Sequence, residues 1–226
     1  MKLTDSFSAL LTVILGSAVA ISSSAESEMS VVPLDPASDQ TQALAAPARI
    51  WQGEVGDGFQ STVQTFSIET AVVLGVQAFG GQQVHDLALL SLSYGHMLGN
   101  VVGGDHWYRG NWEGRLELFG GGQFSPVADP LVGLTPHIRY DFATGSRWVP
   151  FFDLGGGVTA SGIGAPDQSG TFEFNLQANI GTHFFLRDNL ALTSEVGYLH
   201  FSCAGIHPPN LGVNTIKGTI GLTLFF

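Results

Sequence analysis

Three polar side chains near the C-terminal end of the sequence are of the types that carry out acyl transfer. His200 and Ser202 are two residues apart, so they share one face if this segment is a β-strand. Asn214 follows after a connection rich in Pro and Gly. A serine hydroxyl, a histidine that takes its proton and a third group that orients the imidazole are the minimum set for a covalent acyl-enzyme mechanism. These residues are our candidates for catalysis.

The elements that must position them are β-strands, because apolar and polar residues alternate along most of the chain. In residues 172–184, for example, Phe174 and Leu176 fall on one face, while Glu173 and Gln177 fall on the other. The same period of two recurs in eight segments, which are residues 66–74, 90–94, 115–118, 134–142, 152–159, 172–184, 190–198 and 216–226. The repetition of a nearly pure apolar face predicts an all-β, eight-stranded antiparallel transmembrane β-barrel with both termini in the periplasm.

The two faces of these strands have opposite environments in such a barrel. The apolar face contacts lipid, and the polar face fills an interior that has room only for side chains. The charged residues expected inside, as a structural ion-pair network, are Glu69, Arg115, Glu117, Arg139, Asp153, Glu173, Glu195 and Lys217.

Composition supports this class and excludes others. The 226 residues are 44% hydrophobic and only 12% charged, yet no run after residue 25 is long enough for a membrane helix. A net charge of −11 argues against a nucleic-acid partner. With Cys203 as the one cysteine, a disulfide framework and a cysteine-based zinc site are excluded, and we expect neither metal nor cofactor.

The chain is expected to divide into three parts. Lys2 followed by a short apolar stretch and small residues predicts a cleaved signal peptide over residues 1–25. Residues 26–62 are predicted to form a periplasmic linker, and residues 63–226 the barrel. The protein should therefore be exported and integral to the outer membrane of a Gram-negative cell.

Parity places the candidate residues on the outside of this barrel. His200 and Ser202 continue the outward row of Tyr198, and Asn214 continues the outward row of Ile216. About 30 Å of tilted strand separates the chain end from Asn214, which puts the three side chains at the outer membrane interface. Interfacial polar residues that merely meet lipid headgroups are the alternative explanation.

The segment from His200 to Asn214 resembles the signature of the PagL-type lipid A 3-O-deacylases, a family of outer-membrane barrels. That signature runs approximately H-x-S-N-A-G and then P-N-x-G-V-E, and here it reads His200-Phe201-Ser202-Cys203-Ala204-Gly205 and Pro209-Asn210-Leu211-Gly212-Val213-Asn214. Cys203 stands where the family often has Asn, and Asn214 stands in place of the acidic member of the triad.

The resemblance implies roles for several residues. Ser202 would be the nucleophile, His200 the general base and Asn214 the third member of the site. Asn210, with the backbone N–H groups of Ala204 and Gly205, would hold the oxyanion.

The function implied is an esterase that removes the 3-O-linked acyl chain from lipid A of lipopolysaccharide. Two alternatives stay open, a non-catalytic barrel with a structural or adhesion role and an outer-membrane phospholipase. The sequence also leaves the number of subunits open, with a homodimer among the alternatives.

Overall fold

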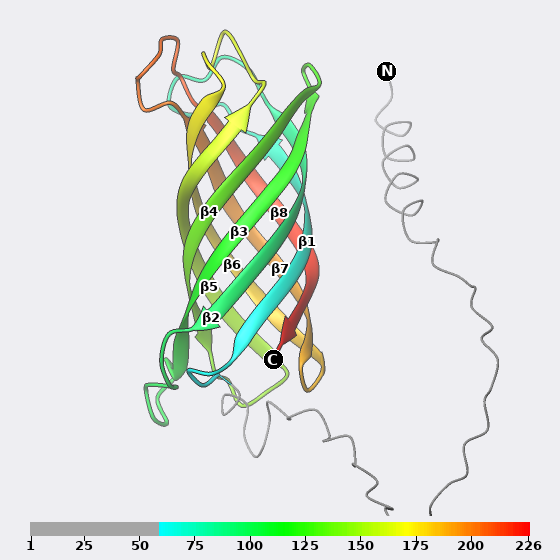
Figure 1. Ribbon diagram of the computed structural model, residues 1–226, viewed down its shortest axis with the longest axis vertical. Coiled ribbons are helices and arrows are strands. Elements are labelled where there is room, and N and C mark those ends of the chain that lie inside the picture. The colour runs from blue at the N-terminus through cyan, green and yellow to red at the C-terminus, as the bar shows by residue number, and fades with distance from the viewer. Residues whose placement is uncertain (1–58) are drawn as a thin grey trace, which may run out of the picture. The chain divides into compact units, whose positions relative to one another are not determined.

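The computed structural model describes residues 59–226, which form one closed barrel of eight antiparallel strands in sequential order (Figure 1). The strands are β1 (Gln64–Gly75), β2 (Asp86–Met97), β3 (Gly110–Ser125), β4 (Asp129–Phe142), β5 (Trp148–Ser161), β6 (Phe172–Arg187), β7 (Leu190–Ser202) and β8 (Val213–Phe225). β1 pairs with β8 and closes the barrel. The predicted eight-stranded antiparallel barrel is confirmed. The predicted signal peptide and most of the predicted linker lie outside the described residues.

The two ends of the barrel differ in their connections. β1 begins and β8 ends at the same end, here called the terminal end, where residues 98–109, 143–147 and 188–189 connect the strands. The opposite end, here called the distal end, carries residues 76–85, 126–128, 162–171 and 203–212 (Figure 1). Within residues 59–226, no helix is long and apolar enough to cross a membrane.

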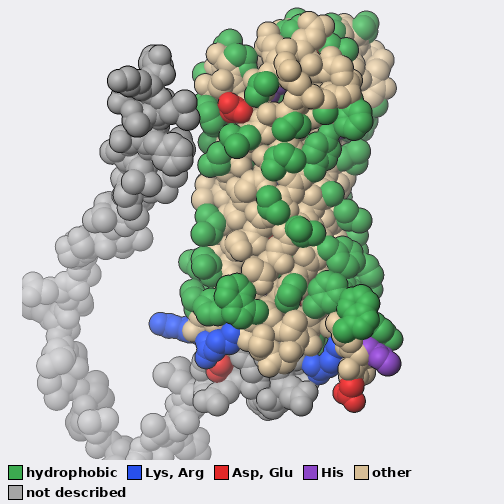
Figure 2. Space-filling model, turned by 180° about the vertical axis from the view of Figure 1, so that it is seen from behind, with side chains coloured by type: hydrophobic (Ala, Val, Ile, Leu, Met, Phe, Trp, Pro, Cys, Tyr) green, Lys and Arg blue, Asp and Glu red, His purple; other side chains and the backbone are tan. Residues whose placement is uncertain are grey.

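The outer wall of the barrel is apolar, as the alternation predicts. Phe174 and Leu176 are 40% and 59% exposed, and Ile220 and Leu222 are 52% and 46% exposed. Apolar side chains are spread over the whole height of the wall (Figure 2). A surface of this kind is stable against hydrocarbon.

The middle of the interior holds the predicted ion-pair network, and every charged residue assigned to the inside is buried. Arg115 contacts Glu69 and Asp153 at 3.2 and 3.0 Å, and Arg139 contacts Asp153 and Glu195 at 3.1 and 2.6 Å. Glu69, Arg115, Arg139, Asp153 and Glu195 therefore have opposite charges beside them, which offsets the cost of removing them from water. The prediction is wrong for two residues: within residues 59–226 the Glu173 carboxylate makes no hydrogen bond, and Lys217 bonds to the neutral side chain of Gln177 at 2.7 Å.

The expectation of a polar interior is wrong for the two ends of the barrel. Buried apolar side chains, among them Leu89, Phe119 and Phe201, fill the distal end. A second group, in which Phe59 packs on Phe225, fills the terminal end. The polar network is thus enclosed between two apolar layers.

Two local features depend on glycine or on the bounds of a strand. A Cβ at Gly155 of β5 would come within 2.5 Å of the His137 ring, so this glycine permits close packing. The segment 115–118 predicted for the third strand is too short. β3 already begins at Gly110, with Asn111 and Glu113 buried inside and Trp112 packed on Tyr140 outside.

Candidate functional site

The candidate residues meet where β7 and β8 reach the distal end. His200 lies directly opposite Asn214 in the antiparallel register, and Ser202 lies opposite Phe174 of β6. The side chains of His200 and Ser202 are half-buried on the outer face of β7, as parity predicts. The site is therefore built by neighbouring strands and opens on the outer wall of the barrel.

The His200 imidazole is held by the side-chain amide of Asn214. The distance from His200 Nδ1 to Asn214 Oδ1 is 2.8 Å, and the Tyr198 hydroxyl donates to the same oxygen. Asn214 Nδ2 donates to the carbonyl oxygens of Ala78 at 3.1 Å and Gly212 at 3.5 Å. Because those carbonyls require a donor, Oδ1 must face the imidazole. His200 then carries its proton on Nδ1, which leaves Nε2 free to accept one.

The predicted position of Asn214 on the lipid-facing surface is wrong in one respect. Its side chain continues the outward row, but the residue is only 3% exposed. The backbone of the β1–β2 loop lies over it, and the Ala78 carbonyl bonds to its amide. A long-range contact of this kind leaves no local pattern in the sequence. Tyr198 and Ala78 are accordingly the two contacts that sequence reasoning missed.

Ser202 and His200 are brought to one face but are not joined. Within residues 59–226, the Ser202 hydroxyl makes no hydrogen bond, either with His200 or with another group. Contacts between a nucleophile and its base are often long without substrate and tighten when the substrate binds. The structure thus leaves the hydroxyl free to turn toward Nε2 of the imidazole.

A sharp turn follows the serine. Ala204 and Gly205 have φ angles of 53° and 80°, and the Ile206 amide donates to the Cys203 carbonyl at 3.1 Å. Asn210 Oδ1 accepts from the Cys203 amide at 2.9 Å. In the described part of the chain, Asn210 Nδ2 and the backbone N–H groups of Ala204 and Gly205 donate no hydrogen bond. Three unused donors therefore lie beside Ser202, as an oxyanion requires.

Cys203 is packed against the backbone of the turn. Its side chain is fully buried, and its Sγ lies 3.1 Å from the His207 carbonyl oxygen. A buried thiol of this kind is a packing residue, since reactive cysteines are partly exposed.

The distal loops are tied together by Asp167, a buried residue of the β5–β6 loop. Its carboxylate accepts from the amides of Gln82 and Gln83 at 2.7 and 2.8 Å and contacts the His85 ring at 2.9 Å. Its backbone carbonyl accepts from the Leu211 amide at 2.9 Å. Burial raises the pKa of Asp167, but these amides and the ring outweigh it and lower the pKa below the usual value. Asp167 thus joins the loop that holds Asn214, through its carboxylate, to the loop that holds Asn210, through its backbone carbonyl.

The lack of a side chain at Gly212 leaves room for the His200 imidazole. Its φ is 80°, and a Cβ there would lie 2.7 Å from His200 Cε1. We predict that Gly212→Ala displaces the ring and lowers esterase activity about 100-fold, since a misplacement of about 1 Å can cost that much. The measurement is the rate of acyl release by the folded barrel.

Gly80→Ala is the matched control for that variant. Gly80 also has a positive φ, of 95°, but a Cβ there meets no atom within 4 Å. Both variants share a backbone strain of about 1–3 kcal/mol, and only Gly212→Ala adds the contact with His200. Equal losses in the two variants would contradict the steric explanation.

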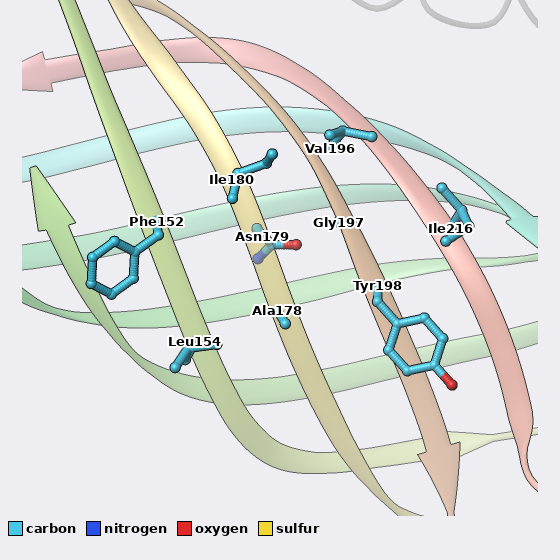
Figure 3. Close-up of a pocket in the computed structure, with 9 residues that line it drawn as sticks. All are labelled: Phe152, Leu154, Ala178, Asn179, Ile180, Val196, Gly197, Tyr198 and Ile216. Atoms are coloured by element: carbon cyan, nitrogen blue, oxygen red, sulfur yellow. The ribbon is translucent and has the colours of Figure 1, made fainter.

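An apolar groove of about 420 Å³ runs along the outer wall below the site (Figure 3). It crosses β5 to β8 and is lined by Phe152, Leu154, Ala178, Asn179, Ile180, Val196, Gly197, Tyr198 and Ile216. Of the β7 residues that line it, Tyr198 lies nearest the distal end, and its hydroxyl also bonds to Asn214, so the groove leads to the imidazole (Figure 3). Ala178 leaves the space between its larger neighbours open.

Within residues 59–226, no group of three or more His, Cys, Asp or Glu side chains could hold a metal ion.

Comparisons with known proteins agree with this geometry. A family model described as lipid A 3-O-deacylase (PagL) matches residues 88–223. The crystal structure of the outer membrane enzyme PagL is 19% identical and covers 69% of this chain and 97% of its own, with a TM-score of 0.53. Neisserial surface protein A is 15% identical and covers 72% of this chain and 97% of its own, with a TM-score of 0.51. No curated protein matches the chain.

Proposed function

This chain belongs to the lipid A 3-O-deacylase (PagL) family, and we propose that it hydrolyses the 3-O-linked acyl ester of lipid A. The observation that carries the proposal is the hydrogen bond of 2.8 Å between His200 and Asn214 beside Ser202, on the outer wall of the barrel. The protein is an integral outer-membrane barrel. We place the terminal end in the periplasm, so that the site meets the outer leaflet, where lipopolysaccharide lies.

The reaction proceeds through an acyl-enzyme. His200 Nε2 takes the proton of Ser202, and Oγ attacks the acyl carbonyl carbon. The C–O bond to the sugar breaks, and the sugar oxygen takes the proton from His200. Water then adds to the acyl-enzyme with His200 again as base, which releases the fatty acid and restores the Ser202 hydroxyl.

The oxyanion is stabilised by the unused donors of the turn after Ser202. Asn210 Nδ2 and the N–H groups of Ala204 and Gly205 are the donors available. Such donors act mainly on the charge that develops in the transition state.

Asn214 acts as a positioning residue. Its Oδ1 fixes the tautomer and orientation of the His200 ring, but an amide cannot neutralise the imidazolium that forms during the reaction. We therefore expect a functional site that is slower than one with a carboxylate in this position.

The groove below the site is suited to the acyl chain that is removed. It is apolar and faces the hydrocarbon, and Tyr198 at its distal end contacts the third member of the site. A chain lying in it would bring its carbonyl carbon toward Ser202.

Ala178→Phe should lower the deacylation rate about tenfold or more, because a large side chain in the middle of the groove obstructs the acyl chain. Ala88→Phe is the matched control, since Ala88 faces outward on β2, which lies outside the groove. A rate that falls equally in both variants would indicate a general effect on the barrel. The measurement is acyl release from lipid A at matched folding.

The decisive experiment is mass spectrometry of lipids from cells with and without this chain. Lipid A from expressing cells should lose the mass of one 3-linked hydroxyacyl chain. Cleavage of phospholipids with lipid A intact would favour the phospholipase alternative, and no change in either would favour a structural or adhesion role. All residues of the proposed site come from one chain, so a homodimer is an additional arrangement, which crosslinking of the purified barrel would test.

A further inference from the structure

The positive charges of the chain are distributed very unevenly. The sequence has eight Lys and Arg residues in all. Lys2 and Arg49 lie outside the described residues, Arg115, Arg139 and Lys217 are buried inside the barrel, and Arg109, Arg147 and Arg187 lie at the terminal end. On the face drawn in Figure 2, Lys and Arg gather at the terminal end. Within residues 59–226, the distal end therefore has neither Lys nor Arg.

Around the candidate site, the exposed side chains are apolar or neutral instead of Lys or Arg. Phe79 is 84% exposed and follows Ala78, whose carbonyl holds Asn214. Ile206 is 57% exposed and lies in the turn after Ser202. At the distal end of the described barrel, the side chains that can carry a positive charge are those of histidine. The imidazole of one of them, His85, is already bonded to Asp167.

The acidic side chains of the distal end add charge of the opposite sign. Asp86 and Asp129 begin β2 and β4, and Asp167 joins the loops. Proteins usually hold a phosphate group with guanidinium or ammonium groups, which replace the water around it. The described residues of the distal end offer neither group to a bound phosphate.

We propose that the site takes an acylated sugar lipid whose headgroup is recognised without its phosphates, through apolar and neutral hydrogen-bonding contacts. The inference rests on the proposed deacylase function and names the form of substrate that the site accepts. Phosphate on the sugar is tolerated only when a divalent cation screens it.

The test compares lipid A in its phosphorylated form with the same lipid after chemical removal of the phosphates. The full-length barrel is folded in neutral-lipid vesicles that contain either substrate, with Mg²⁺ or with a chelator. We expect the phosphate-free lipid to be deacylated at least as fast as the phosphorylated lipid, and its rate to be the same under both conditions.

The outcomes separate this proposal from the proposed function. If the phosphorylated lipid is deacylated several-fold faster than the phosphate-free lipid in the chelator, recognition depends on phosphate and the inference is wrong. If phosphorylated lipid A reacts only with Mg²⁺ while the phosphate-free lipid needs none, the inference is supported. If neither lipid loses an acyl chain under any condition, the deacylase function itself fails.

A variant pair tests the charge argument directly. Ile206→Arg places a guanidinium beside Ser202, and it should raise the ratio of the phosphorylated to the phosphate-free rate about two- to fivefold, the effect of one exposed ion pair. Ser146→Arg adds the same charge in the β4–β5 turn at the terminal end and should leave the ratio unchanged. An unchanged ratio for Ile206→Arg would contradict the proposal.

Discussion

Ser202→Ala should abolish deacylation, with a loss of about three to six orders of magnitude in rate. In the proposed mechanism this hydroxyl forms the acyl-enzyme, and the fully buried Cys203 thiol next in the chain cannot replace it. The fold should not change, because within the described residues this hydroxyl makes no hydrogen bond. The measurement is the mass of lipid A from cells that express each form at equal level.

Ser194→Ala is the matched control for this loss. Ser194 lies on the same outward face of β7, is exposed, and is far from the distal loops. Its variant should deacylate lipid A at the rate of the unaltered protein. Substantial activity in Ser202→Ala would show that another group is the nucleophile.

Asn214→Ala should lower the rate about 100-fold, because the imidazole loses the acceptor that fixes its tautomer and orientation. Asn214→Glu should raise the rate about tenfold above the unaltered protein, since a carboxylate stabilises the imidazolium. The carboxylate also loses the bond to the Ala78 carbonyl, at a cost of about 1–3 kcal/mol, which limits the gain.

Rates of the three forms are compared at matched folding, judged by heat-modifiable gel mobility, and over a range of pH. The acid limb of the pH–rate profile should move to higher pH in Asn214→Glu, because a carboxylate favours the protonated imidazole. A merely structural role for Asn214 would change the amount of folded barrel without moving this limb. Equal rates in all three forms would remove Asn214 from the site.

The fold was predictable because each strand carries its own signal. Alternation in residues 172–184 assigns Phe174 to the outside and Glu173 to the inside without knowledge of any other strand. The start of β3 was missed since Gly110 and Gly114 interrupt the alternation that Asn111 and Glu113 continue. The apolar layers at the barrel ends were missed because they gather residues from many strands.

The site was predictable only in part. Register alone pairs His200 with Asn214, and the parity of β7 gives the face of Ser202. The contact of Asn214 with Ala78 spans 136 residues, and the contacts of Asp167 with the amides of Gln82 and Gln83 depend on how loops fold over the barrel end. Such contacts follow from the closure of the barrel and leave no periodic trace in the sequence.

The proposed position of the active site on the outer wall changes what substrate concentration means for this enzyme. His200 and Ser202 face away from the barrel interior, so a lipid substrate arrives by lateral diffusion within the leaflet. The rate should therefore follow the mole fraction of lipid A in the membrane, and adding inert lipid should slow the reaction even when the amounts of enzyme and substrate per volume are constant. The rate should saturate with the surface density of lipid A in the membrane, and not with its bulk concentration. Kinetic constants for this protein should therefore be given in units of surface density.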